Sequence, residues 1–428
     1  MFPGAPFLKL FVFTLACGAL GACRSEPREA TPSAASKPAV HVEKTRPPAQ
    51  PSVAPAAAGD AAHGKTLVQK YECSRCHDGT GVPSAPLEQH CLHCHQDILA
   101  GKFKASPEKL SKWQKNVTWV RDIPSLAATG ARFRATWIER FLQQPHDLRP
   151  ALAQSMPRLE ISPSDARDIA AYLTAGAAKG APSAVPSGDL TQGRELFETK
   201  GCGSCHRFSG VGQLATTPRL DGPVDQQRAA SLAPDLRHTR ERFRPEQIVR
   251  WILAPKSLKP DTLMPTSPLN QQEASELAHF ILSAPLAPAA VKAVPSRLPV
   301  LTRKVTFEEV NERVLAKTCR HCHGNPDVAL GDGGPGNTGG FGFAPRRLNL
   351  ASYSGVAAGL LDAQQQRMSV FAKTSDGTPR LVAALLARQA EEAGKPNPEV
   401  RGMPLGLPSL PADDVQLVET WIAQGRPK

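Results

Sequence analysis

Short amphipathic segments recur along this chain, each ending at a cysteine. Apolar residues follow helical spacing over residues 64–73 and 193–202, and both segments place a glycine nine residues before the cysteine. Residues 307–319 repeat the pattern with a looser match. The spacing therefore predicts three units that each open on a short helix.

Each unit also closes on a common pattern, in which a Met-Pro pair precedes a last amphipathic segment. Ser162 with Asp165, and Asn270 with Glu273, are helix-start signals for two of these segments. Helical spacing at both ends of every unit predicts an all-α fold. The three pairs are Met156-Pro157, Met264-Pro265 and Met403-Pro404.

Proline, alanine and serine separate the units at residues 178–188 and 284–298, as in flexible linkers. A longer stretch of this composition follows the N-terminus and cannot bury enough apolar area to offset the entropy of ordering it. The 41 prolines and the aromatic content of 5% favour small domains over one large core. We expect a disordered tether over residues 23–58 and domains over residues 59–178, 188–285 and 301–428.

Residues 1–22 have the pattern of an export signal. An apolar run over residues 10–16 follows Lys9 and is too short to span a bilayer. The sequence Leu20-Gly-Ala-Cys23 resembles the bacterial lipoprotein box, in which Cys23 becomes the acylated first residue; the alternative is an ordinary cleaved signal. No apolar run of 18 or more residues follows, which excludes an internal membrane span. We expect an exported chain, held by lipid on the periplasmic side or in the cell envelope.

Four copies of the pattern Cys-x-x-Cys-His account for every cysteine of the mature chain. Ten cysteines are present, of which Cys17 would leave with the signal and Cys23 would take the lipid. Chance predicts about 0.006 copies in a chain of this composition. The four copies hold Cys73, Cys76 and His77; Cys91, Cys94 and His95; Cys202, Cys205 and His206; and Cys319, Cys322 and His323.

This spacing suits the covalent attachment of haem. Two thiols three positions apart each add to one vinyl group of the same haem, and the next histidine supplies an axial nitrogen to the iron. A zinc site would need a second paired motif, a thioredoxin-like site would need a βαβ context, and a disulfide across three residues would be strained. We therefore expect four covalently attached haem c groups.

The formal charge of +12 does not indicate nucleic-acid binding. Loss of Lys9 with the signal leaves +11, and the eight propionates of four haems bring the mature chain to about +3. We therefore expect the basic excess to neutralise haem propionates, and we expect no nucleic-acid partner.

The order of helix, Cys-x-x-Cys-His, helix, Met-Pro and last helix resembles the class I cytochrome c fold. The mature chain resembles a multihaem c-type cytochrome of the bacterial lipoprotein type, with three tandem cytochrome c-like domains over residues 60–176, 188–284 and 303–427. The resemblance implies that the first and last helices of each unit cross near the haem. It also implies Met156, Met264 and Met403 as distal iron ligands, and a soft thioether raises the reduction potential. Met368, in a stretch expected to be helical, is a rival for the third methionine position.

The first unit departs from the single-haem pattern because it holds two motifs. The motif at Cys91 lies in an inserted segment without a methionine of its own, so its sixth ligand is open. His90 and His93 are too close in sequence to reach across the ring, which leaves His63 as the first candidate and His146 as the second.

The third unit contains a glycine-rich segment over residues 331–343. It formally matches the dinucleotide-binding pattern G-x-G-x-x-G, which needs a strand before it and a helix after it. A haem motif precedes the segment and Pro335 interrupts it, so we expect a flexible loop.

These patterns predict electron transfer by a membrane-anchored tetrahaem cytochrome, which exchanges electrons with redox proteins as a free carrier or as a subunit of a respiratory complex. The alternative is an enzyme, such as a multihaem peroxidase or reductase, which needs an open or exchangeable iron. The haem at Cys91 and His95 is the place for one. A haem-based sensor would also need an exchangeable ligand, and usually a signalling domain.

Overall fold

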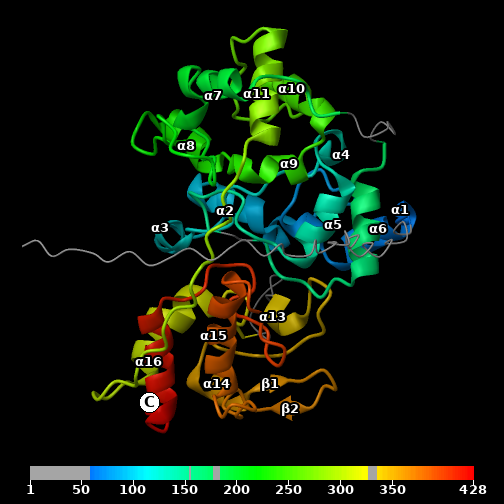
Figure 1. Cartoon of the computed structure of the whole chain (residues 1–428). Helices are drawn as coiled ribbons and strands as arrows, with labels where there is room; N and C mark the ends of the chain where they lie inside the picture. Colours follow the sequence, from blue (N-terminus) through cyan, green and yellow to red (C-terminus); the bar gives the residue numbers. More distant parts are fainter. Residues whose placement is uncertain (1–57, 154–155, 177–183, 326–334) are drawn as a thin grey trace, which may run out of the picture. The chain divides into compact units, whose positions relative to one another are not determined.

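Short helices joined by long loops make up the computed structural model, which describes residues 58–153, 156–176, 184–325 and 335–428 (Figure 1). Residues Ala57–Lys428 form one compact unit. The export signal, Cys23, almost all of the expected tether and residues 331–334 of the glycine-rich segment lie outside the described residues. Within the described ranges, no helix has both the length and the hydrophobicity to cross a bilayer.

The first unit is helical, as predicted. The side chain of Asp60 caps its first helix by accepting hydrogen bonds from two backbone amides, and Ser162 caps its last helix by accepting from the amide of Asp165 at 3.0 Å. The elements are α1 (Ala61–Lys70), η1 (Cys73–Arg75), η2 (Leu87–Gln89), α2 (Cys91–Leu99), α3 (Pro107–Asn116), α4 (Thr129–Arg132), α5 (Ala135–Gln143) and α6 (Pro163–Leu173).

The second unit has the same opening and closing helices. Asn270 and Glu273 form the predicted capping box at the start of its last helix. The elements are α7 (Leu190–Thr199), η3 (Cys202–Ser204), α8 (Val224–Leu232), η4 (Leu236–His238), α9 (Thr239–Arg242), α10 (Pro245–Leu253), η5 (Pro255–Ser257) and α11 (Gln271–Ser283).

The third unit differs most from the repeat. Its opening helix begins as α12 (Phe307–Val310) and continues to the motif cysteine as the π-helix η6 (Asn311–Cys319). Met368 lies in a small antiparallel hairpin and pairs with Leu360, so the prediction of a helix around it was wrong. The remaining elements are α13 (Pro335–Thr338), α14 (Tyr353–Ala358), β1 (Leu360–Leu361), β2 (Arg367–Met368), α15 (Arg380–Glu392) and α16 (Ala412–Ala423).

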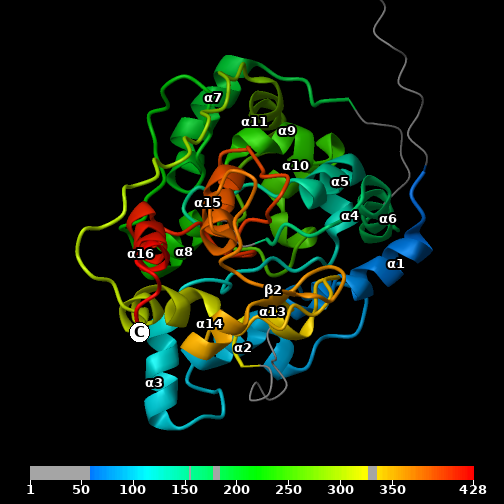
Figure 2. The same ribbon diagram turned by 90° about the horizontal axis from the view of Figure 1, so that it is seen from below.

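Glycine allows the first and last helices of the first two units to cross closely. A Cβ at Gly64 in α1 would lie 2.0 Å from the carbonyl oxygen of Asp168 in α6, and one at Gly193 in α7 would lie 2.3 Å from that of Glu276 in α11. In both views α1 runs beside α6, and α7 beside α11 (Figure 1 and Figure 2). The equivalent position of the third unit holds Val310, which is fully buried. The looser sequence match there therefore reflects a different helix crossing.

Three clusters of buried apolar side chains follow the three units along the chain. Val68 and Ile169 lie in the first cluster, Phe197 and Phe280 in the second, and Trp421 in the third. Each cluster joins residues from the opening and closing helices of its own unit. Full burial of one such side chain stabilises the fold by about 1.5–3 kcal/mol, so these clusters hold the helix crossings together.

The first and second units meet through two copies of the sequence Arg-Phe-Arg, centred on Phe133 and Phe243. An isolated antiparallel bridge joins the two phenylalanines. The amide of the last arginine in each copy donates to the carbonyl oxygen of the first arginine in the other, over 3.0 and 2.8 Å. The two rings meet edge to face with their centroids 5.8 Å apart. Equivalent segments of the two units thus contact each other reciprocally.

Candidate functional site

In all four Cys-x-x-Cys-His motifs the histidine follows the first cysteine by one helical turn. The histidine amide donates to the carbonyl oxygen of Cys73, Cys202 and Cys319 over 2.9, 2.9 and 3.0 Å, respectively. Cys91 begins helix α2, which also contains His95. Since positions i, i+3 and i+4 of a helical turn lie on one face, each motif presents two thiols and one imidazole to the same side of its backbone.

Backbone carbonyl groups orient three of the four imidazoles. Nδ1 of His77 donates to the carbonyl oxygen of Pro124 at 2.8 Å. In the same way, Nδ1 of His95 donates to Trp119 and Nδ1 of His206 to Pro234, each at 3.0 Å. A carbonyl oxygen only accepts, so Nδ1 carries the proton and Nε2 keeps its lone pair. A histidine that binds a metal through Nε2 needs this tautomer and this second partner.

Burial keeps the four imidazoles in their neutral form. It is the first cause of a pKa below the ordinary value of 6.5 for His77, His95 and His206. For His323, burial lowers the pKa to about 4, while the Asn337 side chain opposes the shift. Neutral imidazole is the form that binds a metal ion.

The fourth imidazole, that of His323, lies close to the backbone of the segment that begins at residue 335. A Cβ at Gly336 would lie 2.3 Å from Cε1 of His323, so only glycine allows the chain to pass this close. Asn337, the next residue, is fully buried, and its side chain contacts the same ring. The sequence around the fourth motif therefore places a short helix, α13, against its histidine.

None of the eight cysteines in the described residues forms a disulfide. Cys73, Cys202 and Cys319 pack against the apolar clusters of the first, second and third unit, and burial raises their pKa to about 11, about 11 and about 12. A hydrogen bond with the Cys91 thiol, together with burial, raises the pKa of Cys76 well above 9.0. The thiols thus border apolar space, and the first two motifs touch each other.

The three predicted methionines lie on loops ahead of the closing helices. Met156 packs against the first apolar cluster, which Cys73 also contacts. The amide of Met264 donates to Oγ1 of Thr262 at 3.2 Å, and that of Met403 to the carbonyl oxygen of Ala384 at 2.9 Å. The Met264 contact is local to its loop, whereas the Met403 contact attaches its loop to α15.

The two histidines predicted as sixth ligands of the Cys91 haem have partners elsewhere. His63, half exposed on α1, donates from Nδ1 to Oδ2 of Asp168 at 2.8 Å. The ring of His146 lies 5.0 Å from that of His238, in a group that includes Glu241. These contacts belong to the α1–α6 crossing and to the junction with the second unit.

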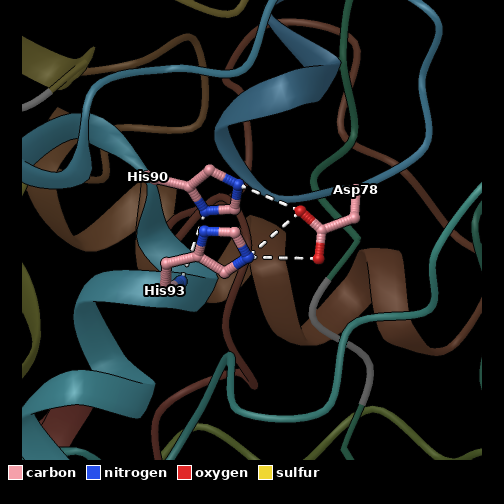
Figure 3. A group of neighbouring side chains, drawn as sticks. All are labelled: Asp78, His90 and His93. Carbon is pink, nitrogen blue, oxygen red and sulfur yellow. Dashed lines mark hydrogen bonds and ion pairs between the residues drawn. The ribbon is translucent and has the colours of Figure 1, made fainter.

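Asp78, His90 and His93 form a polar cluster between the first two motifs (Figure 3). Nε2 of His93 donates to Oδ2 of Asp78 at 3.1 Å, and the rings of His90 and His93 stack at 3.7 Å. Nδ1 of His90 accepts from the amide of His93 at 3.3 Å and so caps helix α2. Both histidines thus join the first motif to the second through Asp78.

Two buried arginines lie near the Phe133–Phe243 bridge, and their charge bears on whether the site fits haem. Burial lowers the pKa of Arg132 and of Arg242 to about 10, and the Nε atom of each is buried without a hydrogen-bond partner. Within the described ranges neither guanidinium forms an ion pair with a carboxylate. A buried cation needs a compensating anion, and haem brings two propionates. Arg132 donates to the carbonyl oxygen of Ala127 at 3.4 Å and both guanidinium groups lie over the ring of Phe133, but none of these partners carries a full negative charge. The donor set and these cations without a carboxylate partner therefore fit haem c.

Sequence reasoning missed the prolines and arginines of this site. Pro124 and Pro234 each stand nine residues before the phenylalanine of an Arg-Phe-Arg copy. Alignment of the first two units over this segment, rather than over the helices and motifs alone, would have identified both prolines and the arginines Arg132 and Arg242.

Comparison with known proteins finds its family match in the second unit. Residues 190–285 match the family model for cytochrome c. Over 123 residues, or 29% of this chain, the sequence is 28% identical to the cbb3-type cytochrome c oxidase subunit CcoP of Helicobacter pylori, strain ATCC 700392 / 26695, and equally to that of strain 52. The chain spans about a third of the length of these relatives, 36% and 35%. No solved structure matches.

The second unit is thus a cytochrome c domain, which implies covalently bound haem c and haem-based electron transfer.

Proposed function

We propose that this chain is an exported, lipid-anchored tetrahaem c-type cytochrome that transfers electrons between redox proteins of a respiratory or related chain. The observation that carries the proposal is one local arrangement repeated at four places, in which two thiols and an imidazole share one face of a helical turn. Haem c supplies the one-electron change at its iron. The residues of the chain hold the group, exclude water from it and tune its potential.

Each haem would be held by the two cysteines and the histidine of one motif. The carbonyl groups of Pro124, Trp119 and Pro234 keep Nε2 of three of these histidines available as a ligand. Met156, Met264 and Met403 would supply the opposite ligand for the haems at Cys73, Cys202 and Cys319, respectively. A thioether favours the reduced iron, so these three sites would form a high-potential group.

Three tandem cytochrome c-like domains, over residues 59–178, 188–285 and 301–428, would carry these haems. Three separate apolar clusters support this division, because each is contacted by the first cysteine of the motif in its own unit. The close contact of Cys76 with Cys91 favours electron exchange between the first two haems. Arg132 and Arg242 would bind haem propionates at the junction of the first two domains.

The similarity to CcoP favours a role for this chain close to a terminal oxidase. CcoP is a subunit of a cbb3-type cytochrome c oxidase, and this chain would act either as a subunit of such a complex or as a carrier that reacts with one. Lipid on Cys23 and the tether over residues 23–58 would keep the haem domains close to the membrane and free to reach a partner.

Ligand binding separates electron transfer from the enzyme and sensor alternatives. If every iron has two axial ligands from the protein, the fully reduced chain binds no carbon monoxide and turns over no peroxide. Carbon monoxide binding at one site, together with peroxide turnover, would contradict the proposal and favour the peroxidase or reductase.

The lipid anchor is tested separately. A Cys23→Ala protein should leave the membrane fraction in a salt wash that retains the wild-type protein, because a multiply acylated cysteine anchors firmly. Retention of the variant would contradict lipidation, and a Cys17→Ala protein serves as the matched control.

A further inference from the structure

The imidazole rings of His95 and His321 come from two distant parts of the chain and lie beside each other. Their centroids lie 6.2 Å apart, and their planes are tilted by 46°. His95 belongs to the motif that has no methionine. His321 lies between the two cysteines of the fourth motif, Cys319 and Cys322.

A second contact between the same two segments supports this placement. The carbonyl oxygen of Trp119 accepts the hydrogen bond from Nδ1 of His95. The side chain of Trp119 lines a pocket together with Arg313, Lys317 and Thr318, which lie in the π-helix that leads to His321. The segment that orients His95 thus borders the same pocket as the helix that leads to His321.

The separation of the two rings suits a shared metal ion. Two imidazoles on opposite sides of one ion, each bonded through nitrogen at about 2.0 Å, have centroids roughly 6 Å apart. The pair is not a face-to-face stack, since the stacked rings of His90 and His93 lie only 3.7 Å apart. The Nδ1 proton of His95 is already donated to Trp119, so Nε2 is the atom of His95 left for the ion.

We propose that His321 is the second axial ligand of the haem bound by Cys91, Cys94 and His95. The inference rests on the proposed function and completes the one haem site for which the repeat offers no methionine. It takes the place of His63 and His146, because His321 is the histidine whose ring lies beside that of His95, whereas the ring of His146 packs against His238 and His63 lies at the α1–α6 crossing.

This assignment joins two haem sites within one short segment. Cys319, Cys322 and His323 would hold the fourth haem, while His321 between them reaches the second. Imidazole favours ferric iron more than a thioether does, so the second haem would have the lowest potential of the four. The segment 319–323 would then be a direct link between the first and third units for electron exchange.

The test uses the full-length holoprotein and the variant His321→Ala. Denaturing mass spectrometry first counts the haems; fewer than four in the wild-type chain would contradict the proposed function itself. With four haems present, His321→Ala should convert one low-spin ferric signal in the electron paramagnetic resonance spectrum to high spin. The reduced variant should bind one carbon monoxide per chain, against none for the wild type. Added imidazole should restore the low-spin signal.

Three control variants locate the effect. Arg320→Ala changes the neighbouring exposed residue of the same motif and should leave the spectrum unchanged, as should His63→Ala and His146→Ala. A wild-type spectrum in His321→Ala, or a high-spin signal caused by His63→Ala or His146→Ala instead, would overturn the assignment. If His321→Ala does not fold, His321→Met should remain six-coordinate and raise the potential of one component. An unchanged titration of His321→Met would overturn the inference.

Discussion

Nδ1 of His63 donates a hydrogen bond to Oδ2 of Asp168 over 2.8 Å, where α1 crosses α6. The contact raises the pKa of His63 above 6.5 and lowers that of Asp168 below 3.8, in each case chiefly through this hydrogen bond. Both side chains reach solvent at the edge of the crossing. The pair therefore links the opening and closing helices of the first unit in a manner that depends on pH.

The pair should stabilise the first unit only over a limited range of pH. The stabilisation that protonated His63 provides is fully present below pH 6.5 and is lost as the pH rises through the raised pKa of His63. The stabilisation that ionised Asp168 provides is fully present above pH 3.8 and is lost as the pH falls through the lowered pKa of Asp168. The difference in melting temperature between wild type and His63→Gln should thus be greatest near pH 5 and should shrink on either side. A difference independent of pH would contradict this pairing.

The helix crossings should not tolerate a methyl group. Because a Cβ at Gly193 would lie 2.3 Å from the Glu276 carbonyl oxygen, Gly193→Ala should destabilise the second unit by about 1–3 kcal/mol in denaturant titration. Gly64→Ala should have a similar effect in the first unit. In Gly212→Ala the added methyl would meet only a side-chain nitrogen of Arg194 at 3.9 Å, so stability should be retained. Equal stability of all three variants would contradict the close crossings.

Methionine ligation should be visible in the near-infrared spectrum. Ferric haem with a methionine ligand has a charge-transfer band there. Met264→Ala should remove the part of the band intensity that one haem contributes, and should lower the reduction potential of one component. Met368→Ala, which changes a residue of the β1–β2 hairpin, should leave the band intact. If Met264→Ala spares the band, Met264 only packs; if Met368→Ala weakens it, Met368 rather than Met403 serves the fourth haem.

The buried arginines should raise the potentials of nearby haems. Removal of a buried positive charge favours the ferric state, so Arg242→Leu should lower at least one potential in a redox titration of the holoprotein. Arg140→Leu, at a side chain that is 64% exposed, should have little effect because solvent screens its charge. Equal shifts in the two variants would contradict a role for burial.

Local features of this molecule could be predicted from the sequence because each depends on residues close together along the chain. Helix caps such as Ser162 and Asn270, and the turn of each Cys-x-x-Cys-His motif, belong to this class. The helix expected around Met368 failed because Asp362 accepts backbone hydrogen bonds in a turn and a hairpin forms instead.

Contacts between distant segments could not be predicted in the same way. Nothing near His95 in the sequence indicates His321, which is more than 200 residues away, and their proximity depends on the packing of the first unit against the third. The choice of His63 rested on its distance from the haem segment alone. The polar partner that the fold supplies, Asp168, lies in a helix at the other end of the unit.

Counting the electrons that the chain accepts is the most direct test of the central claim. In an anaerobic reductive titration of the oxidised holoprotein, followed by the α-band absorbance of reduced haem, four haems predict an end point at four electrons per chain. One component should be reduced last, at the lowest potential, after the three methionine-ligated sites. An end point at three electrons or fewer per chain would contradict a tetrahaem electron-transfer protein.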